Sequence, residues 1–437
     1  MLNAVPQTEG RKLFWLSILF LIPTYLQRLA NSGQGDRYGE FDGISLAPVG
    51  YVSNILIILY CIFVAKNTFN RTHLIFAVGL FIYGLVQIYV SYNVYGDDLP
   101  QMLFSYLRAL MWAFCAYAFA AKLFDKAIFV EAFMAITSLF FVVVILSALQ
   151  YALTGIPFGM VIGQGVERAH GTFTEPSVLG AIAPAYVLIA LINRNYVMVT
   201  IGVAALYFAN STTAYTTFIL TLAVFVCFGF PRLQKFILFA VVLAFAFFLI
   251  QIDLQNSYFI SDLARSFSEF LDSTIGKSDV RAFTIDRLLN SIIDIPKFLS
   301  SGETDYTQEL GSLARLGGPR VMITHMYNDG LYWYGYGLSI FAVISLGIYK
   351  SVLDFGILPY FLSCFGVGFG MIIILFFTSR VVWWRDYDRS AFILFTSTLF
   401  GTILNSAGGL SVYIFVLLGA FSAVIQKPLL HSKVGDT

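Results

Sequence analysis

Long apolar stretches recur along the whole chain, and no other feature constrains its fold as strongly. Each stretch has about 17–25 residues, the length that an α-helix needs to cross the hydrocarbon core of a bilayer. The 437-residue chain is 58% hydrophobic and only 12% charged, which is about half the charged share of an average soluble domain. The sequence therefore predicts an all-α, polytopic integral membrane protein that forms a single transmembrane domain over residues 1–437.

The apolar stretches define the candidate membrane spans. They cover residues 13–29, 47–65, 74–93, 102–121, 127–152, 177–193, 196–210, 212–230, 236–252, 331–349, 355–378, 390–405 and 410–426. One of them, 331–349, contains "GLYWYGYGLS", whose glycines and tyrosines suit a segment that packs on the outer face or re-enters it. About twelve spans are therefore favoured over thirteen, because twelve also keep the basic groups near the C-terminal end on the same side as the other basic loops.

Basic residues in the short connections predict the orientation. The pairs Arg11/Lys12 and Lys122/Lys126 fall on alternate connections, and the positive-inside rule places that side in the cytoplasm. The opposite side then carries "RAHGTFTEPS", "NSTT" and a charge-rich stretch. This stretch, over 253–354, is expected to be one large outer loop with short amphipathic helices packed on the outer face.

Several classes of function find no support. A net charge of +1 gives no argument for nucleic-acid binding. The chain has no HExxH or DxD motif and no carboxylate pair at ligand spacing, so no metal site is predicted. It also has no GxxxxGK[ST] motif, so nucleotide hydrolysis is not predicted and no cofactor is expected. The four cysteines lie in apolar stretches, as expected of small core residues rather than disulfides: Cys61, Cys115, Cys227 and Cys364.

Charged residues lie just before one apolar stretch, in "RAHGTFTEPSVLG". Pro176 and Ser177 suit the first turn of a helix, and Glu175 would then only complement the helix dipole. That reading leaves Arg168 and His170 unexplained, although both lie a few residues upstream of the same helix. The alternative is a site at the outer end of the helix.

Arginines elsewhere in the chain extend this hypothesis. Arg108 lies one or two turns into the fourth stretch, where it either reaches the interface or lines an anion site in a wet cavity. In "GSLARLGGPR", Arg315 and Arg320 stand beside glycines with no acid nearby. Because the guanidinium fork suits phosphate oxygens, these arginines and Arg168 are expected to surround a diphosphate.

The segment "RAHGTFTEPSVLG" is similar to the R-x-x-G-x-F-x-E-P-S element of bacterial Wzy-type polysaccharide polymerases, which share a superfamily with the O-antigen ligases. The rest of the likeness, over about residues 100–426, is mostly a pattern of helices. The stretches that resemble the family are "NSTTAYTTFILTL", "SLARLGGPRVMITHMYNDGLYWYGYGLS", "SVLDFGILPYFL" and "GTILNSAGGLSVYIFVLLGA". The resemblance implies a GT-C-like arrangement with a large periplasmic loop.

Two departures from the family pattern leave the register open. Ligases typically carry a His-Asn pair before the late glycine-containing helix, and here the two residues before "SVLDFG" are tyrosine and lysine. If "HMYNDGLYWYGYGLS" is the matching stretch instead, His325 is present and the asparagine is displaced to Asn328. Arg281 also fits the loop-arginine pattern about as well as Arg315. The missing His-Asn pair and the Glu-Pro-Ser element together favour a polymerase over a ligase.

The resemblance implies an inverting, metal-independent glycosyltransferase in the bacterial inner membrane, with its active site facing the periplasm. Undecaprenyl-diphosphate-linked oligosaccharide would be both donor and acceptor, with the bilayer and a chain-length regulator protein as further partners. Glu175 is expected to be the base, and Arg168 its catalytic partner. The residues expected to bind diphosphate or substrate are Arg108, Arg281, Arg315, Arg320, His170, His325 and Tyr336. The alternatives are an O-antigen ligase, a lipid-linked glycan flippase or other transporter, and a non-catalytic membrane assembly protein.

Overall fold

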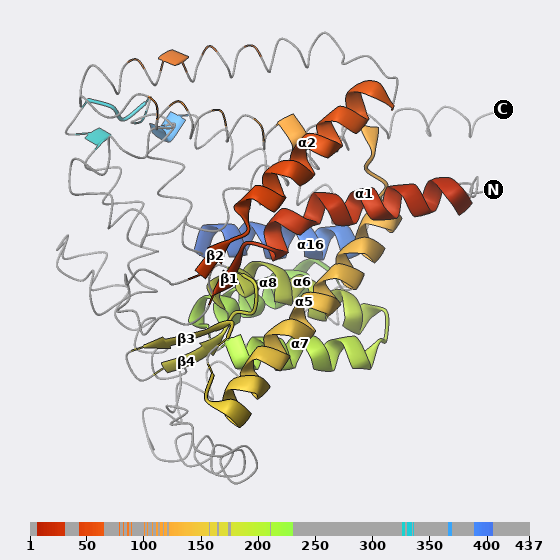
Figure 1. The fold of residues 1–437 in the computed structure, drawn as a ribbon, viewed down its shortest axis with the longest axis vertical. Helices are drawn as coiled ribbons and strands as arrows, with labels where there is room; N and C mark the ends of the chain where they lie inside the picture. The colour runs from red at the N-terminus through yellow and green to blue at the C-terminus, as the bar shows by residue number, and fades with distance from the viewer. Residues whose placement is uncertain are drawn as a thin grey trace.

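The computed structural model describes four main parts of the chain. These are residues 7–30, 43–64, most of 122–229 (all but 157, 164–165, 174–175 and 210), and 389–404. Single residues and short pieces are described between 78 and 119, in 326–335 and at 366–368, and the remaining residues lie outside the described part. The described residues are mostly helical, as the sequence predicts, with two short hairpins between the helices (Figure 1).

The first two helices form an antiparallel pair joined by a small hairpin. They are α1 (Gln7–Tyr25) and α2 (Ala47–Phe63), and the hairpin between them pairs β1 (Arg28–Ala30) with β2 (Gly43–Ser45). Pro23 lies inside α1 and has no N–H to donate to the carbonyl of Leu19, four residues earlier. The hydroxyl of Ser53 on α2 donates to that carbonyl instead. The neighbouring helix thereby supplies the hydrogen bond that the proline cannot donate to this carbonyl.

The longest described helix, α5 (Lys126–Thr154), runs parallel to α1. It begins after Asp125, whose side chain accepts a hydrogen bond from the Ile128 N–H at 3.1 Å. The rings of Phe20 and Phe129 have centroids 6.4 Å apart, and further along both helices the hydroxyls of Tyr25 and Thr137 are 2.6 Å apart. Because these contacts advance towards the C-terminal end of both helices, the two helices point in the same direction.

A second parallel pair involves α2 and the described helical residues up to Lys122. The Cys115 thiol donates to Asn54 Oδ1 at 3.3 Å, and Lys122 Nζ donates to the carbonyl of Cys61 at 2.8 Å. Both bonds join residues that are 61 positions apart in the chain. The two segments therefore also point the same way.

Helix α6 lies at the centre of the remaining bundle, where it contacts α5 and packs most extensively against three further helices. It spans Leu179–Ile192, and its neighbours are α7 (Tyr196–Ala209), α8 (Thr212–Gly229) and α16 (Arg389–Leu404). Gly202 allows α7 to lie close against α6, because a Cβ at this position would lie 2.6 Å from Val187 Cγ2 of α6. Figure 1 shows α16 running alongside α6 and α8, although it comes from the far end of the sequence.

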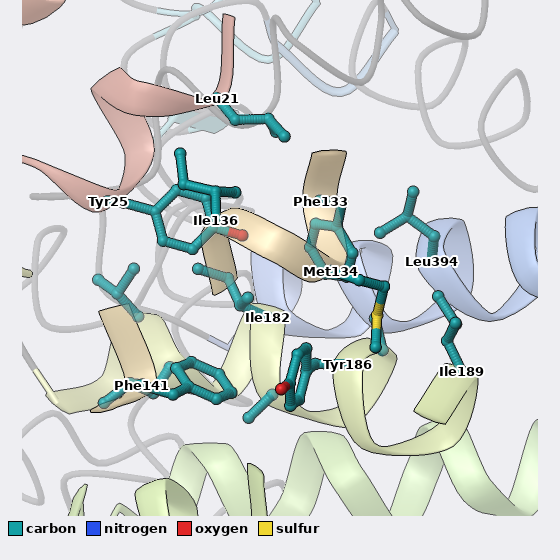
Figure 2. Packing of buried hydrophobic residues seen from close by; sticks show 14 of the residues in the cluster. Leu21, Tyr25, Phe133, Met134, Ile136, Phe141, Ile182, Tyr186, Ile189 and Leu394 are labelled. Atoms are coloured by element: carbon teal, nitrogen blue, oxygen red, sulfur yellow. The ribbon is translucent and has the colours of Figure 1, made fainter. Parts of the chain in front are cut away.

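The core fills the space between these helices with aromatic and branched side chains. Figure 2 shows Leu21 and Tyr25 of α1, Phe133 and Phe141 of α5, Tyr186 of α6 and Leu394 of α16 in one layer. The ring of Tyr186 meets that of Phe141 edge-on at 5.1 Å, and its hydroxyl lies 2.7 Å from that of Ser138. One hydrophobic cluster thus joins the N-terminal helices to α6 and α16.

Seven of the predicted stretches are confirmed as helices, six of them within two residues at each end. The exception is α1, which begins six residues before the predicted start and ends four before the predicted end. Every described residue of 74–93 and 102–121 is helical, whereas Leu331, Tyr332, Trp333 and Gly335 lie in a turn. Of the predicted loop 253–354, only the short pieces at 326–335 are described. The stretches 236–252 and 410–426 lie outside the described residues.

Within the described part, α5 is the one helix that is long and apolar enough to cross a membrane. The other apolar helices there are shorter, with 10–17 residues in their apolar portions. Large apolar side chains lie exposed along one stripe of α5, at every third or fourth position: Leu139, Val142, Leu146, Leu149 and Leu153. Exposed apolar stripes of this kind mark surfaces that contact a membrane or another protein.

Candidate functional site

The residues singled out before α6 begin in the second strand of a hairpin that follows α5. Its strands are β3 (Met160–Gly163) and β4 (Val166–Ala169), and Arg168 pairs with Val161 in the antiparallel register. Figure 1 shows this hairpin at the same end of the bundle as β1–β2. The sequence did not predict either hairpin. Strands of three or four residues are too short to give an alternating pattern, although "GQG" occurs in the sequence between the strands of each hairpin, at 33–35 and at 163–165.

The chain turns sharply at a glycine on each side of the hairpin, at Gly159 before β3 and at Gly171 after β4. The N–H groups of His170 and Gly171 both donate to the carbonyl of Gly159, at 2.8 and 3.0 Å. Gly159 and Gly171 have φ of +65° and +59°, where a side chain is disfavoured. A Cβ on Gly159 would lie 2.7 Å from Ser147 Oγ and 3.0 Å from Gly171 Cα. The turn therefore needs glycine for both its conformation and its packing on α5.

Thr172 fixes the same turn to the end of α1. Its hydroxyl donates to the carbonyl of Tyr25 at 2.7 Å, and its own carbonyl accepts from the N–H of Gln27 at 3.1 Å. The last carbonyls of a helix have no N–H partner within the helix, and Thr172 supplies a donor to one of them at the end of α1. The segment Arg168–Phe173 is thus held by α1 on one side and by α5 on the other.

His170 is almost fully enclosed within this segment, with 1% of its surface exposed. Its Nδ1 lies 2.6 Å from the carbonyl oxygen of Phe173, whose N–H donates to the carbonyl of His170 at 3.1 Å. Since a carbonyl can only accept, Nδ1 carries the hydrogen. The other ring nitrogen, Nε2, is shielded from solvent. The buried imidazole ring therefore joins the two ends of the His170–Phe173 turn by a hydrogen bond.

Arg168 is the more accessible of the two predicted site residues that the structure describes. Its side chain is half-buried, and its Nε atom is shielded from solvent. A guanidinium presents five donors in a rigid fork that matches phosphate and carboxylate oxygens. A half-buried guanidinium at the rim of a bundle suits the binding of an anion that arrives from outside.

The chain from Arg168 leads into a helix start, and helix starts in general favour anions. The 3₁₀-helix η1 (Pro176–Val178) leads into α6 and also contacts α8. No side chain caps the first turn of α6, where Val178 occupies the capping position. The free N–H groups at helix starts carry partial positive charge and attract anions. The chemistry that this end of the bundle can support is therefore stabilisation of negative charge.

Of the nine predicted site residues, the structure describes Arg168 and His170, which are two positions apart in the chain. The other seven lie outside the described residues: Glu175, Arg108, Arg281, Arg315, Arg320, His325 and Tyr336. Glu175 follows Phe173 by two positions and directly precedes Pro176. The described residues contain no cluster of three or more His, Cys, Asp or Glu side chains that would hold a metal.

Sequence reasoning missed Gly159 and Thr172, which hold the turn in place. Gly159 lies eleven residues before His170 and belongs to no motif, so only the hairpin register reveals its role. Thr172 lies within "RAHGTFTEPS", yet its partner Tyr25 is 147 residues away. The chain matches no protein-family model, and comparison with curated proteins finds no significant relative.

Proposed function

We propose that the protein is an inverting, metal-independent glycosyltransferase that polymerises undecaprenyl-diphosphate-linked oligosaccharide repeats. In this proposal it crosses the bacterial inner membrane about twelve times, and its site faces the periplasm. The observation that carries the proposal is the position of Arg168. Arg168 is half-buried on a segment that α1 and α5 hold in place, in the stretch of chain that leads into α6.

The exposed apolar stripe of α5 supports the membrane location. Such side chains are compatible with lipid and costly in water, at about 25 cal/mol for each Å² of apolar surface. The directions of the helices support it as well, since α1 and α5 point one way and α2 points the other. This is the alternation that the basic connections lead us to expect.

Chemically, the reaction requires one substitution at the anomeric carbon of the donor glycan. The terminal sugar hydroxyl of the acceptor attacks that carbon from the face opposite the diphosphate. The new C–O bond forms as the bond to the diphosphate oxygen breaks, and the lipid diphosphate leaves with the electron pair. Arg168 and the other arginines stabilise the negative charge that grows on the leaving group. Glu175 takes the proton of the attacking hydroxyl.

The test is a polymerisation assay with purified protein and a defined lipid-linked repeat. Arg168→Ala is expected to lower chain growth by about 100-fold or more, as loss of one charge-stabilising donor does in other enzymes. Arg168→Lys keeps the charge without the fork and should lie between Arg168→Ala and the unchanged protein. Glu175→Gln removes the proton acceptor and should abolish growth. Arg389→Ala, at an exposed arginine that begins α16, is the matched control and should retain activity.

The products distinguish the proposal from its alternatives. A ladder of lengthening chains on a single lipid is the polymerase result. Transfer of finished chains to a different lipid acceptor would instead identify a ligase, and movement of the oligosaccharide across vesicles without lengthening would identify a flippase. Normal ladders from both Arg168→Ala and Glu175→Gln would remove this site from the reaction.

A further inference from the structure

The short turn between α6 and α7 has a residue at its centre that its geometry does not favour. Within the described residues, Arg194 is the one residue other than glycine with a positive φ, of +55°. A side chain in this left-handed region is disfavoured, because its Cβ crowds the carbonyl oxygen that follows. Residues held in such a conformation concentrate at places that bind ligands.

Hydrogen bonds at the end of α6 require this conformation. The N–H of Asn195 donates to the carbonyl of Ala190 at 2.9 Å, and the N–H of Arg194 donates to that of Leu191 at 3.0 Å. These two bonds form a Schellman motif, in which the left-handed position is usually glycine. The side chain of Asn195 then accepts from the Met198 N–H at 3.2 Å, at the start of α7. The turn is thus closed without any bond from the Arg194 side chain.

The side chain of Arg194 is exposed together with large apolar side chains. Within the described part of the chain, its guanidinium has no hydrogen bond or ion pair. The exposed apolar residues next to it in the chain are Leu191, Tyr196 and Val197, at 43%, 69% and 71%. A cation and apolar groups exposed together suit a membrane interface, where the charge lies among headgroups and the apolar groups reach the acyl chains.

This turn lies at the end of the bundle away from Arg168. Helix α6 begins after the β3–β4 hairpin and η1, and its 14 residues carry the chain about 21 Å further along the helix axis. Figure 1 shows the α6–α7 connection at the end of the bundle where the N-terminus of α1 also lies. Arg11 and Lys12, near that terminus, are exposed as well. Basic residues gathered at one end of a membrane bundle complement anionic headgroups.

We propose that the α6–α7 turn binds the headgroup of an anionic phospholipid, with the guanidinium of Arg194 on its phosphate. The guanidinium fork matches two phosphate oxygens. Leu191, Tyr196 and Val197 contact the same lipid below its headgroup. The occupant is a lipid and not a free anion, because a free anion would gain nothing from these three apolar side chains. The inference rests on the membrane location in the proposed function and not on its glycosyl transfer.

The test is thermal unfolding of the purified full chain in detergent micelles, to which phosphatidylglycerol or phosphatidylcholine is added. Phosphatidylglycerol should raise the melting temperature more than phosphatidylcholine does. Arg194→Gln should need about fivefold more phosphatidylglycerol for the same rise, the factor that one basic residue contributes at an anionic membrane surface. Arg194→Lys keeps the charge and should lie between the two. Arg389→Gln, at the exposed arginine that begins α16, is the matched control and should respond as the unchanged protein does.

Arg194→Gly separates lipid binding from a purely structural role. Because glycine suits the left-handed conformation, this variant should melt at the same or a higher temperature in phosphatidylcholine. It should also lose the response to phosphatidylglycerol, as Arg194→Gln does. A lower melting temperature in phosphatidylcholine would show that the guanidinium stabilises the fold itself, through the carbonyl end of α6, and would contradict the inference.

Two further results would overturn the proposal. An equal loss of response in Arg194→Gln and Arg389→Gln would mean that phosphatidylglycerol senses the total charge of the protein and not this turn. An equal rise in melting temperature with inorganic phosphate alone would mean that the guanidinium holds a free anion and that the apolar residues play no part.

A labelled cysteine measures directly whether the turn reaches the bilayer. Tyr196→Cys keeps Arg194 and accepts an environment-sensitive fluorophore, which brominated phosphatidylglycerol in reconstituted vesicles should quench. Emission as in water, without quenching, would place the turn outside the bilayer and end the inference. The outcome is independent of the proposed reaction: polymer ladders without a phosphatidylglycerol response would remove the lipid site alone, and the response without ladders would remove the reaction alone.

Discussion

Two glycines near the candidate site have nearly the same backbone conformation and very different surroundings. Gly155, which ends α5, has φ of +68°, and Gly159 has φ of +65°. A Cβ on Gly155 would meet nothing within 4 Å, whereas on Gly159 it would lie 3.0 Å from the Cα and O atoms of Gly171. The pair therefore separates the cost of a left-handed conformation from the cost of crowding.

We expect Gly155→Ala to lower the free energy of unfolding by about 1–2 kcal/mol, the cost of a left-handed conformation with a Cβ. Gly159→Ala should lower it by a further 1–3 kcal/mol or so, because the turn must move away from the new methyl group. Thermal unfolding of both variants in detergent measures the difference. Equal melting temperatures would show that the turn shifts at little cost.

At the scale of elements, buried hydroxyl groups lie between helices in two distinct settings. The Thr137 hydroxyl of α5 bonds that of Tyr25 on α1, whereas the Thr217 hydroxyl of α8 has no hydrogen-bond partner among the described residues. Neither threonine has any exposed surface. Valine has almost the same shape as threonine and lacks the hydroxyl, so one substitution tests both settings.

The two substitutions should have opposite effects on stability. Thr137→Val removes a bond between α1 and α5 and should lower the free energy of unfolding by about 1 kcal/mol. Thr217→Val removes a hydroxyl that is buried at a desolvation cost, and should leave stability unchanged or raise it. Chemical denaturation of each variant in the same detergent gives both values. A loss of stability in Thr217→Val would instead reveal a polar group, such as water, bonded to that hydroxyl.

The sequence was sufficient to predict the helices because their apolar stretches are long and end at polar residues. It placed the start of α1 too late because Glu9, Arg11 and Lys12 are polar. Helical hydrogen bonding continues through such residues, although hydropathy gives no sign of it. Strands β1 to β4 were missed because three or four residues carry no period that can be recognised.

For the candidate site, the sequence grouped Arg168 and His170 by their nearness in the chain. It assigned both to one site, Arg168 as a catalytic residue and His170 as a substrate-binding residue, because residue type and spacing do not reveal burial. The difference between a half-buried arginine and an enclosed imidazole depends on packing against α5 and against α1, and α1 reaches the turn from a distant part of the chain.

At the scale of the whole molecule, the exposed stripe on α5 allows a test of whether this helix crosses a membrane. Leu139 lies near the middle of this helix and is 61% exposed, and Leu153 lies next to its last residue and is 84% exposed. The two positions are fourteen residues apart, which is about 21 Å along a helix. In a bilayer, only the residue at the end of the helix would lie within reach of the interface.

Leu139→Arg should therefore reduce the amount of protein inserted in the membrane, since a charge at the centre of a spanning helix costs about 2.5–3.5 kcal/mol on insertion scales. Leu153→Arg should be tolerated, because its guanidinium extends to the headgroups. Carbonate-resistant protein in the membrane fraction is the measurement for both. Equal membrane levels of the two variants would contradict insertion of α5 across the bilayer.

The contact between Thr172 and Tyr25 has a consequence for synthesis of the protein. The last turn of α1 leaves the ribosome long before the residue that completes it, because 147 positions separate the two. At translation speeds of about 5–20 residues per second, that interval is roughly 7–30 s. For that time the end of α1 lacks its partner, and a ribosome that stalls before Thr172 releases a nascent chain whose first helix is still incompletely bonded.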